Sequence, residues 1–110
     1  MRLRLINPNT TVGMTTTIGE AARRVAATGT EIVATQPEHG PVSIESHFDE
    51  AISAVGVLEQ VLTGEREGAD AYIIACFGDP GLLAARELTR APVIGIALAL
   101  NGAAGYKYGI

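Results

Sequence analysis

The sequence is poor in the residues that mark several classes of protein. Its 110 residues include one cysteine and no tryptophan, and only 5% of them are aromatic. A single cysteine cannot form a disulfide within the chain, which fits a reducing compartment, so we expect a cytoplasmic protein. No apolar stretch approaches the roughly 18 residues that a membrane-spanning helix needs. We therefore expect neither a disulfide framework nor a membrane partner.

Positive charge and metal-binding patterns are also scarce. Eight Lys and Arg stand against 12 Asp and Glu, and the basic residues are scattered along the chain. No nucleic-acid partner is expected from this distribution. The two histidines, His39 and His47, lack a ligand-like spacing such as His-Glu-x-x-His, so surface roles are favoured over metal binding. Because no Gly-x-Gly-x-x-Gly or phosphate-binding loop occurs, nothing in the sequence indicates a nucleotide cofactor, and we expect no cofactor and no metal.

What the chain does contain is an alternation of strand-like and helix-like segments. Hydrophobic residues make up 47% of it, which indicates a folded globule. Apolar and β-branched runs predict strands, and apolar residues three and four positions apart predict helices between them. Such alternation is typical of a parallel sheet with right-handed crossovers. The sequence predicts an α/β fold, a four-stranded parallel sheet flanked by helices, with strands at 3–6, 31–35, 71–75 and 93–96 and helices at about 11–25, 46–62 and 81–88.

The second predicted helix has a clear apolar repeat. Its apolar residues recur at helical spacing and define one face, while the polar residues His47, Asp49, Glu50 and Glu59 lie off that face. The repeat consists of Phe48, Ile52, Val55, Leu58 and Leu62.

Three loops follow predicted strands, at the edge where open α/β sheets bind ligands. They span 7–11, 37–43 and 76–80. The first loop carries amide and hydroxyl groups suited to hydrogen-bonding an amide or a carboxylate. From composition alone a turn followed by a helix N-cap is favoured for the same residues, and the binding role remains the alternative. They are Asn7, Asn9, Thr10 and Thr11.

The single cysteine, Cys76, ends a buried-looking strand and begins a glycine-rich turn. A thiol at the carboxyl edge of a strand, facing the N–H groups of the next helix, is in an environment that favours the thiolate. Gly78 would allow a ligand close to the backbone, and Asp79 can cap the helix that Pro80 opens. The N–H groups of residues 77–79 can stabilise an enolate oxygen. A free cysteine can also be a small buried apolar residue, so both roles remain open.

Six stretches, in order over about residues 1–97, together carry a resemblance to a known family. The most specific are Asn7-Pro8-Asn9-Thr10 and Cys76-Phe77-Gly78-Asp79-Pro80-Gly81. With the other four, the chain resembles the hydantoin racemase family within the aspartate/glutamate racemase superfamily. Those four are residues 40–45 (with His47 and 49–51 after them), 68–72, 84–88 and 92–97.

The resemblance implies a cofactor-independent racemase that inverts C5 of a 5-monosubstituted hydantoin by two-base proton transfer. It implies that Cys76 is one of the two acid/base groups. It also implies a two-lobed, pseudo-symmetric fold whose second lobe carries a second cysteine. The implied substrate is a small hydantoin-like molecule, and the full-length family is implied to form homo-oligomers. The implied substrate-binding residues are Asn9, Thr10, Ser43, Phe77, Gly78 and Asp79.

The chain departs from the family pattern in two places. It has no second cysteine, and Leu98 stands where the family usually has an acidic residue. We expect residues 1–97 to form the N-terminal lobe and 98–110 a divergent or truncated tail. Little racemisation is expected from this chain alone, because one thiol returns a proton only to the face from which it took it. Two alternatives remain: a racemase or isomerase of allantoin or another Asp/Glu-type substrate, and a non-catalytic remnant or small-ligand-binding module.

Overall fold

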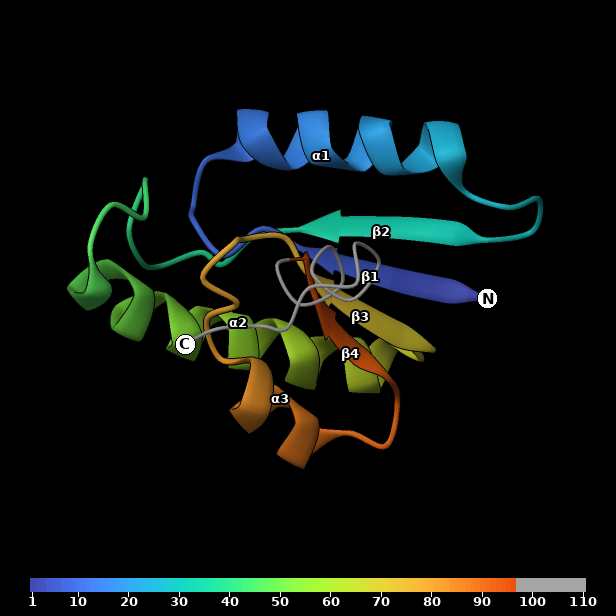
Figure 1. Ribbon diagram of the computed structural model, residues 1–110. Coiled ribbons are helices and arrows are strands. Elements are labelled where there is room, and N and C mark those ends of the chain that lie inside the picture. The colour runs from blue at the N-terminus through green and yellow to red at the C-terminus, as the bar shows by residue number, and fades with distance from the viewer. Residues whose placement is uncertain (97–110) are drawn as a thin grey trace, which may run out of the picture.

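Strands and helices alternate along residues 1–96, the part of the chain that the computed structural model describes (Figure 1). The predicted α/β class is confirmed, and each predicted element is found within a few residues of its expected place. The predicted tail at 98–110 lies outside the described residues. The elements are β1 (Arg2–Ile6), α1 (Val12–Val25), β2 (Glu31–Thr35), α2 (His47–Glu67), β3 (Ala71–Ile74), α3 (Leu82–Leu88) and β4 (Val93–Gly95).

All four strands are parallel and pair in the order β2-β1-β3-β4. The first strand is therefore central. Ile6 at its carboxyl end pairs with Thr35 of β2 on one side and with Ile74 of β3 on the other. The chain turns from β1 to β2 in one direction and then crosses back to β3. This reversal creates a topological switch point between the carboxyl ends of β1 and β3.

Helices cover both faces of the sheet, α1 on one side and α2 with α3 on the other (Figure 1). The main core lies between the sheet and the α2–α3 layer, where Tyr72 and Ile74 are fully buried. Close packing there depends on Gly64: a Cβ at this position would lie 2.5 Å from Cε1 of Tyr72. Helix α2 continues through Gly64 to Glu67, and its C-cap, Gly68, has a left-handed conformation with φ 78°. The core cluster is Ile6, Val57, Val61, Tyr72, Ile74, Ala85 and Val93.

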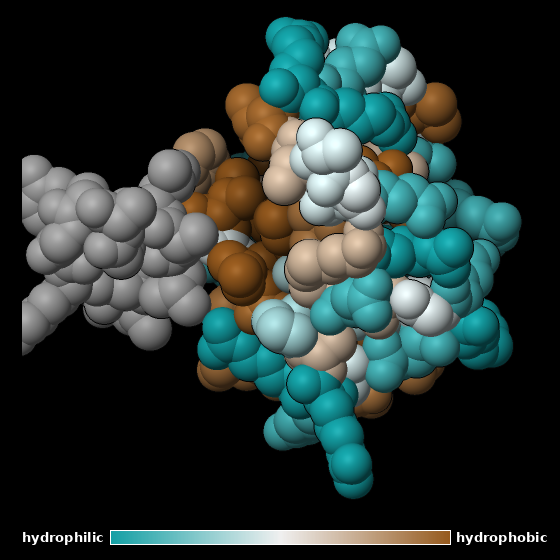
Figure 2. Space-filling model, turned by 90° about the vertical axis from the view of Figure 1, so that its right-hand side faces the viewer, coloured by the Kyte–Doolittle hydropathy of each residue, from teal (hydrophilic) through white to brown (hydrophobic). Residues whose placement is uncertain are grey.

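The opposite face of the sheet is only partly covered. Helix α1 packs on β2, where a Cβ at Gly19 would lie 2.9 Å from that of Ala34. On the same face, Leu5 is buried, Ile73 of β3 is half-buried, and Ile94 of β4 is 42% exposed. Figure 2 shows apolar surface gathered below α1 on this side. Apolar sheet surface is therefore accessible toward the β4 edge.

The apolar repeat that the sequence places on α2 faces solvent over most of its length. Phe48, Ile52, Val55 and Leu62 are all exposed, and only Leu58 packs against the core. The side that faces the sheet carries smaller residues, which let the helix approach the strands closely. These buried residues are Ser53, Gly56, Val57, Val61 and Gly64. Because α2 is apolar on both sides, its periodicity does not reveal which side is buried.

None of the helices within residues 1–96 combines the length and the hydropathy needed to cross a bilayer.

Candidate active site

The topological switch point brings two of the three predicted loops together. The loop after β1 and the loop after β3 leave neighbouring strands, and the N–H of Ala75 donates to the carbonyl of Ile6 at 2.8 Å. On the other side of β1, the N–H of Asn7 donates to the carbonyl of Thr35, also at 2.8 Å. Parallel pairing thus extends one residue beyond the end of β1 and one residue beyond the end of β3. A crevice of this kind is where open α/β sheets bind ligands.

A buried amide network holds the loop after β1 in place. Asn7 is 2% exposed, and its Nδ2 donates to Oδ1 of Asn9 at 2.8 Å and to Oγ1 of Thr15 at 3.1 Å. Oδ1 of Asn9 also accepts from the N–H of Thr11 at 2.9 Å. Two asparagine side chains therefore build the loop and join it to α1.

The side chain of Asn9 is committed mainly to this network. It is buried, and its Nδ2 donates to Sδ of Met14 at 3.1 Å. A thioether is a weak acceptor, so this donor makes a much weaker bond than one to a carbonyl oxygen. Asn9 thus keeps one weakly used N–H donor at the carboxyl edge of the sheet.

The second loop is fastened to the first by two hydrogen bonds. The N–H of Thr10 donates to the carbonyl of Pro41 at 3.0 Å, and Oγ1 of Thr11 donates to the carbonyl of Val42 at 2.8 Å. Ser43 follows directly and is exposed. The structure therefore places Thr10 and the segment next to Ser43 side by side at the edge where Cys76 lies.

The cysteine loop is a tight turn in which Cys76 is only partly buried. Cys76 is a free thiol of intermediate exposure, and its carbonyl accepts from the N–H of Asp79 at 3.0 Å. Phe77 is 69% exposed. Among residues 1–96 no acceptor is found for the N–H groups of Phe77 and Gly78. These two groups, rather than that of Asp79, are therefore the donors left in the loop for a ligand oxygen.

Asp79 does not cap the next helix as the sequence predicts. Helix α3 begins at Leu82, its N-cap is Gly81 in a left-handed conformation, and it has no side-chain cap. Asp79 lies two residues earlier, has a left-handed φ of 46°, and is buried. Its carboxylate points instead at Gly95, in the space where a Cβ of that residue would stand. Backbone strain in a loop at such an edge is frequent in functional sites.

The structure adds one residue that the sequence reasoning missed. The carboxylate of Glu50, in the first turn of α2, occupies the space above Gly78 of the cysteine loop. Its other oxygen lies 3.7 Å from Nδ1 of His47, which is fully exposed. The only sequence signal was the position of Glu50 within one of the family-like stretches. Glu50 and Gly78 lie 28 residues apart in the sequence, so no local sequence pattern relates them.

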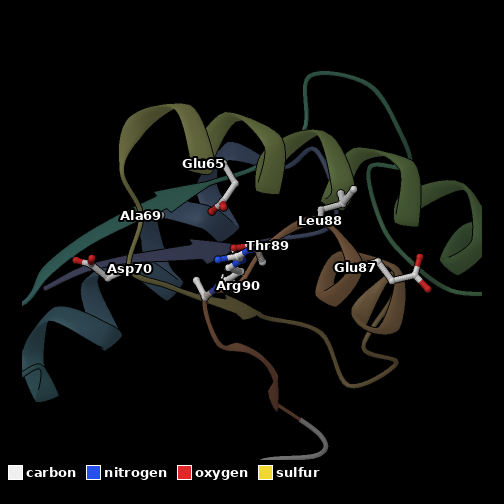
Figure 3. A pocket seen from close by; sticks show the side chains of 8 residues that line it. Glu65, Ala69, Asp70, Glu87, Leu88, Thr89 and Arg90 are labelled. Atoms are coloured by element: carbon white, nitrogen blue, oxygen red, sulfur yellow. Dashed lines mark hydrogen bonds between the residues drawn. The ribbon is translucent and has the colours of Figure 1, made fainter.

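The amino-terminal edge of the sheet has a hollow with a volume of about 720 Å³. In Figure 3, Glu65 points toward Thr89 and Arg90, whereas Glu87 points away from them. The hollow lies where β3 and β4 begin, at the opposite end of these strands from Cys76, and contains none of the predicted site residues. It is therefore distinct from the candidate site. Within residues 1–96, no three or more His, Cys, Asp or Glu side chains converge as a metal site would require.

The chain has a parallel sheet with a topological switch point and a thiol beside it. These features are typical of α/β proteins whose ligand-binding site lies at the carboxyl ends of the strands. A family model described as Asp/Glu/Hydantoin racemase matches residues 3–105. The chain belongs to this family, as its sequence motifs predict.

Individual relatives agree with the family match. The chain is 56% identical over 97 residues to a hydantoin racemase of Pseudomonas sp. (strain NS671), and 51% identical over 98 residues to one of Paenarthrobacter aurescens. These alignments cover 88% of the chain in both cases, but 39% and 42% of the relatives. The chain thus spans about two fifths of their length.

Solved structures show the same relationship. The chain is similar to an allantoin racemase from Klebsiella pneumoniae with a TM-score of 0.94 and 62% identity, covering 96% of the chain and 43% of that protein. For an allantoin racemase from Pseudomonas fluorescens, the TM-score is 0.91 and the identity 38%, covering 96% and 44%. The predicted racemase fold is confirmed by both.

Proposed function

We propose that this chain supplies Cys76 as one of two acid/base groups of a cofactor-independent racemase that acts on 5-monosubstituted hydantoins. The observation that carries the proposal is the place of Cys76: the residue is only partly buried and follows β3 at the switch point between β1 and β3. The relatives named hydantoin racemase support the substrate class.

The chemistry of the substrate suits such a thiol. The C5 proton of a hydantoin lies beside a carbonyl group, so its removal gives an enolate. The thiolate of Cys76 takes this proton, and the N–H groups of Phe77 and Gly78 stabilise the oxygen on which negative charge develops. Inversion also needs a second acid on the opposite face of the ring. This chain has no second cysteine, so we propose that by itself it exchanges the proton with retention of configuration.

The remaining residues of the proposed site position the ring. Thr10 and Ser43 offer hydroxyl groups from two fastened loops, and the exposed ring of Phe77 can pack against the substrate. In this proposal Nδ2 of Asn9, which otherwise donates to the sulfur of Met14, donates to a ring carbonyl of the substrate. Asp79, whose side chain faces β4, acts by fixing the turn that presents the N–H groups of Phe77 and Gly78.

An exchange experiment tests the half-reaction directly. The chain is incubated in deuterated water with one enantiomer of a 5-alkylhydantoin, and both deuterium at C5 and optical rotation are followed. We expect deuterium to enter faster than in a sample without protein, with little loss of rotation. The matched control is Cys76→Ser, which should return the exchange to the uncatalysed rate. Exchange equal in the two proteins, or a Cys76 that an alkylating reagent does not modify, would contradict the proposal.

A second substrate, allantoin, is favoured by a specific observation. The two solved structures compared above are described as allantoin racemases, and one is 62% identical to this chain. Allantoin is itself a hydantoin with a ureido group at C5, so the same chemistry applies. Running the exchange experiment with allantoin and with the alkyl compound in parallel identifies the preferred substrate from the ratio of the two rates.

The unpaired thiol also supports a location in a reducing compartment, and we propose the cytoplasm.

A further inference from the structure

The carboxylate of Glu50 stands beside the cysteine loop and, within residues 1–96, accepts no hydrogen bond. Glu50 lies in the first turn of α2, and a Cβ on Gly78 would be 2.8 Å from its carboxyl carbon. The charged group found near this carboxylate in the same residues is the imidazole of His47, whose Nδ1 is 3.7 Å away, beyond hydrogen-bond distance. The side chain of Glu50 is 38% exposed. Its two oxygens are therefore open to a ligand as acceptors.

The helix fixes the position of this carboxylate. The carbonyl of Ser46 accepts from the N–H of Glu50 at 3.1 Å, and Oγ of Ser46 accepts from the N–H of Asp49, also at 3.1 Å. Oγ of Ser53 donates to the carbonyl of Glu50 at 2.8 Å. The carboxylate of Asp49 is already used, because it accepts from the N–H of Glu45 at 3.0 Å. Of the two carboxylates in this first turn, that of Glu50 is thus the one that a ligand can bind.

A hollow of about 310 Å³ opens at the start of α2. It adjoins the cysteine loop, because Glu50 both lines the hollow and stands over Gly78 of that loop. Figure 1 shows that α2 begins at the end of the sheet where the loop after β3 leaves it. A ring bound at the cysteine loop would therefore have this hollow beside it. The other residues that line it are Ile44, Glu45, Ser46 and His47.

The lining of the hollow favours groups that donate hydrogen bonds. Two of its residues, Glu45 and Glu50, carry carboxylates, and no lysine or arginine is found among the described residues that line it. A carboxylate accepts strongly from N–H groups, and two N–H groups held side by side can bind both of its oxygens. A second carboxylate would be repelled. The ureido group of allantoin presents such a pair of N–H groups, whereas an alkyl group presents none.

We propose that Glu50 is a specificity-determining residue, whose carboxylate binds N–H groups on the C5 substituent of the hydantoin ring. It favours a ureido substituent over an alkyl one and disfavours a substituent that carries a carboxylate. This inference rests on the proposed function in one respect, the binding of the ring at the cysteine loop. It assigns Glu50 no part in the proton transfer at C5.

Three hydantoins of equal size separate polarity from shape. Their C5 substituents are ureido (allantoin), isobutyl and carboxymethyl, which share one branched skeleton and the same number of non-hydrogen atoms. Titration calorimetry measures their binding to the Cys76→Ser chain, so that the result does not depend on proton transfer. We expect allantoin to bind about fivefold more tightly than the isobutyl compound, and the carboxymethyl compound to bind least tightly.

Glu50→Gln in the same background removes the charge and keeps the shape. The advantage of allantoin over the isobutyl compound should fall to about twofold, because a hydrogen bond to an uncharged acceptor is roughly half as strong. The carboxymethyl compound should bind more tightly than before. The matched control is Glu59→Gln, which makes the same change on an exposed side chain of α2 outside the hollow and should leave the three affinities unchanged.

The outcomes separate this proposal from the proposed reaction. Equal affinities for the three compounds, no binding of any of them, or an order of affinities that Glu50→Gln does not alter would overturn the role of Glu50. Deuterium exchange that fails in the wild-type chain, while the expected order of affinities is found, would count against the reaction and leave the role of Glu50 supported.

Discussion

The carboxylate of Asp79 fills the space in which a side chain at Gly95 would stand. This contact joins the end of the cysteine loop to the end of β4, two segments that are separated by α3 along the chain. Asp79 is 9% exposed and has a left-handed backbone, so the loop holds its conformation against some strain.

The first prediction follows from that contact. Gly95→Ala should lower the free energy of unfolding by about 1–3 kcal/mol, because the added methyl group overlaps the buried carboxylate. Asp79→Gly removes the carboxylate and suits the positive φ, so the double variant should lose less than the sum of the two single variants. A double-mutant cycle by urea unfolding measures this coupling. Additive losses would show that the two residues do not constrain each other.

A second prediction concerns the two helical glycines Gly64 and Gly13. Gly64→Ala should destabilise the fold by about 1–3 kcal/mol, because the new Cβ would lie 2.5 Å from the ring of Tyr72 and 2.8 Å from Cδ of Arg4. Gly13→Ala is the matched change in α1, where nothing lies within 4 Å of the added Cβ. It should stabilise the protein by about 0.5–1 kcal/mol, since alanine has the higher helix propensity. Thermal unfolding compares them, and effects of the same sign would refute the packing argument.

A third prediction tests the amide network after β1. Asn7→Ala should cost about 1–3 kcal/mol, because Oδ1 of Asn9 and Oγ1 of Thr15 would lose a donor inside the protein. Thr16→Ala is the control: its hydroxyl donates to the carbonyl of Val12 on the exposed side of α1, and its loss should change stability by about 0.5 kcal/mol or less. Equal losses for the two variants, measured in urea, would mean that burial of the network contributes nothing.

The fourth prediction is a pH dependence that originates at Tyr72. Burial, together with a hydrogen bond to Glu65, raises the pKa of Tyr72 well above its ordinary value of 10.0. The raised pKa means that the fold favours the protonated phenol. Its contribution to stability is therefore complete below about pH 10 and is lost as the pH rises toward the higher value of the folded state.

Tyr72→Phe separates this effect from other alkaline titrations. The variant loses the hydrogen bonds to Glu65 and to the carbonyl of Val61, so it should be less stable at neutral pH. Above about pH 10 the wild type loses stability through Tyr72 and the variant does not, so the difference between them should shrink. Urea unfolding at a series of pH values measures it. A difference that stays constant across the series would contradict the assignment.

Much of the fold could be predicted from the sequence. The apolar run at Ala71–Ile74 and the turn at Asn7-Pro8 are local signals, and both define the elements found there. The family was also identified correctly. The role of Asp79 as a helix cap was wrong, because Gly81 occupies the cap position instead. The predicted site residues stay predictions, although Thr10, Ser43 and Cys76 all lie in loops at one edge of the sheet.

By itself the sequence determined the order and type of the elements, since these depend on residues a few positions apart. Only the tertiary structure decided which side of α2 is buried, that Glu50 lies over Gly78, and that Asp79 faces Gly95. The physical reason is that such contacts depend on how the strands are ordered in the sheet. Insertion of β1 between β2 and β3 brings distant segments together, and neither periodicity nor composition records that arrangement.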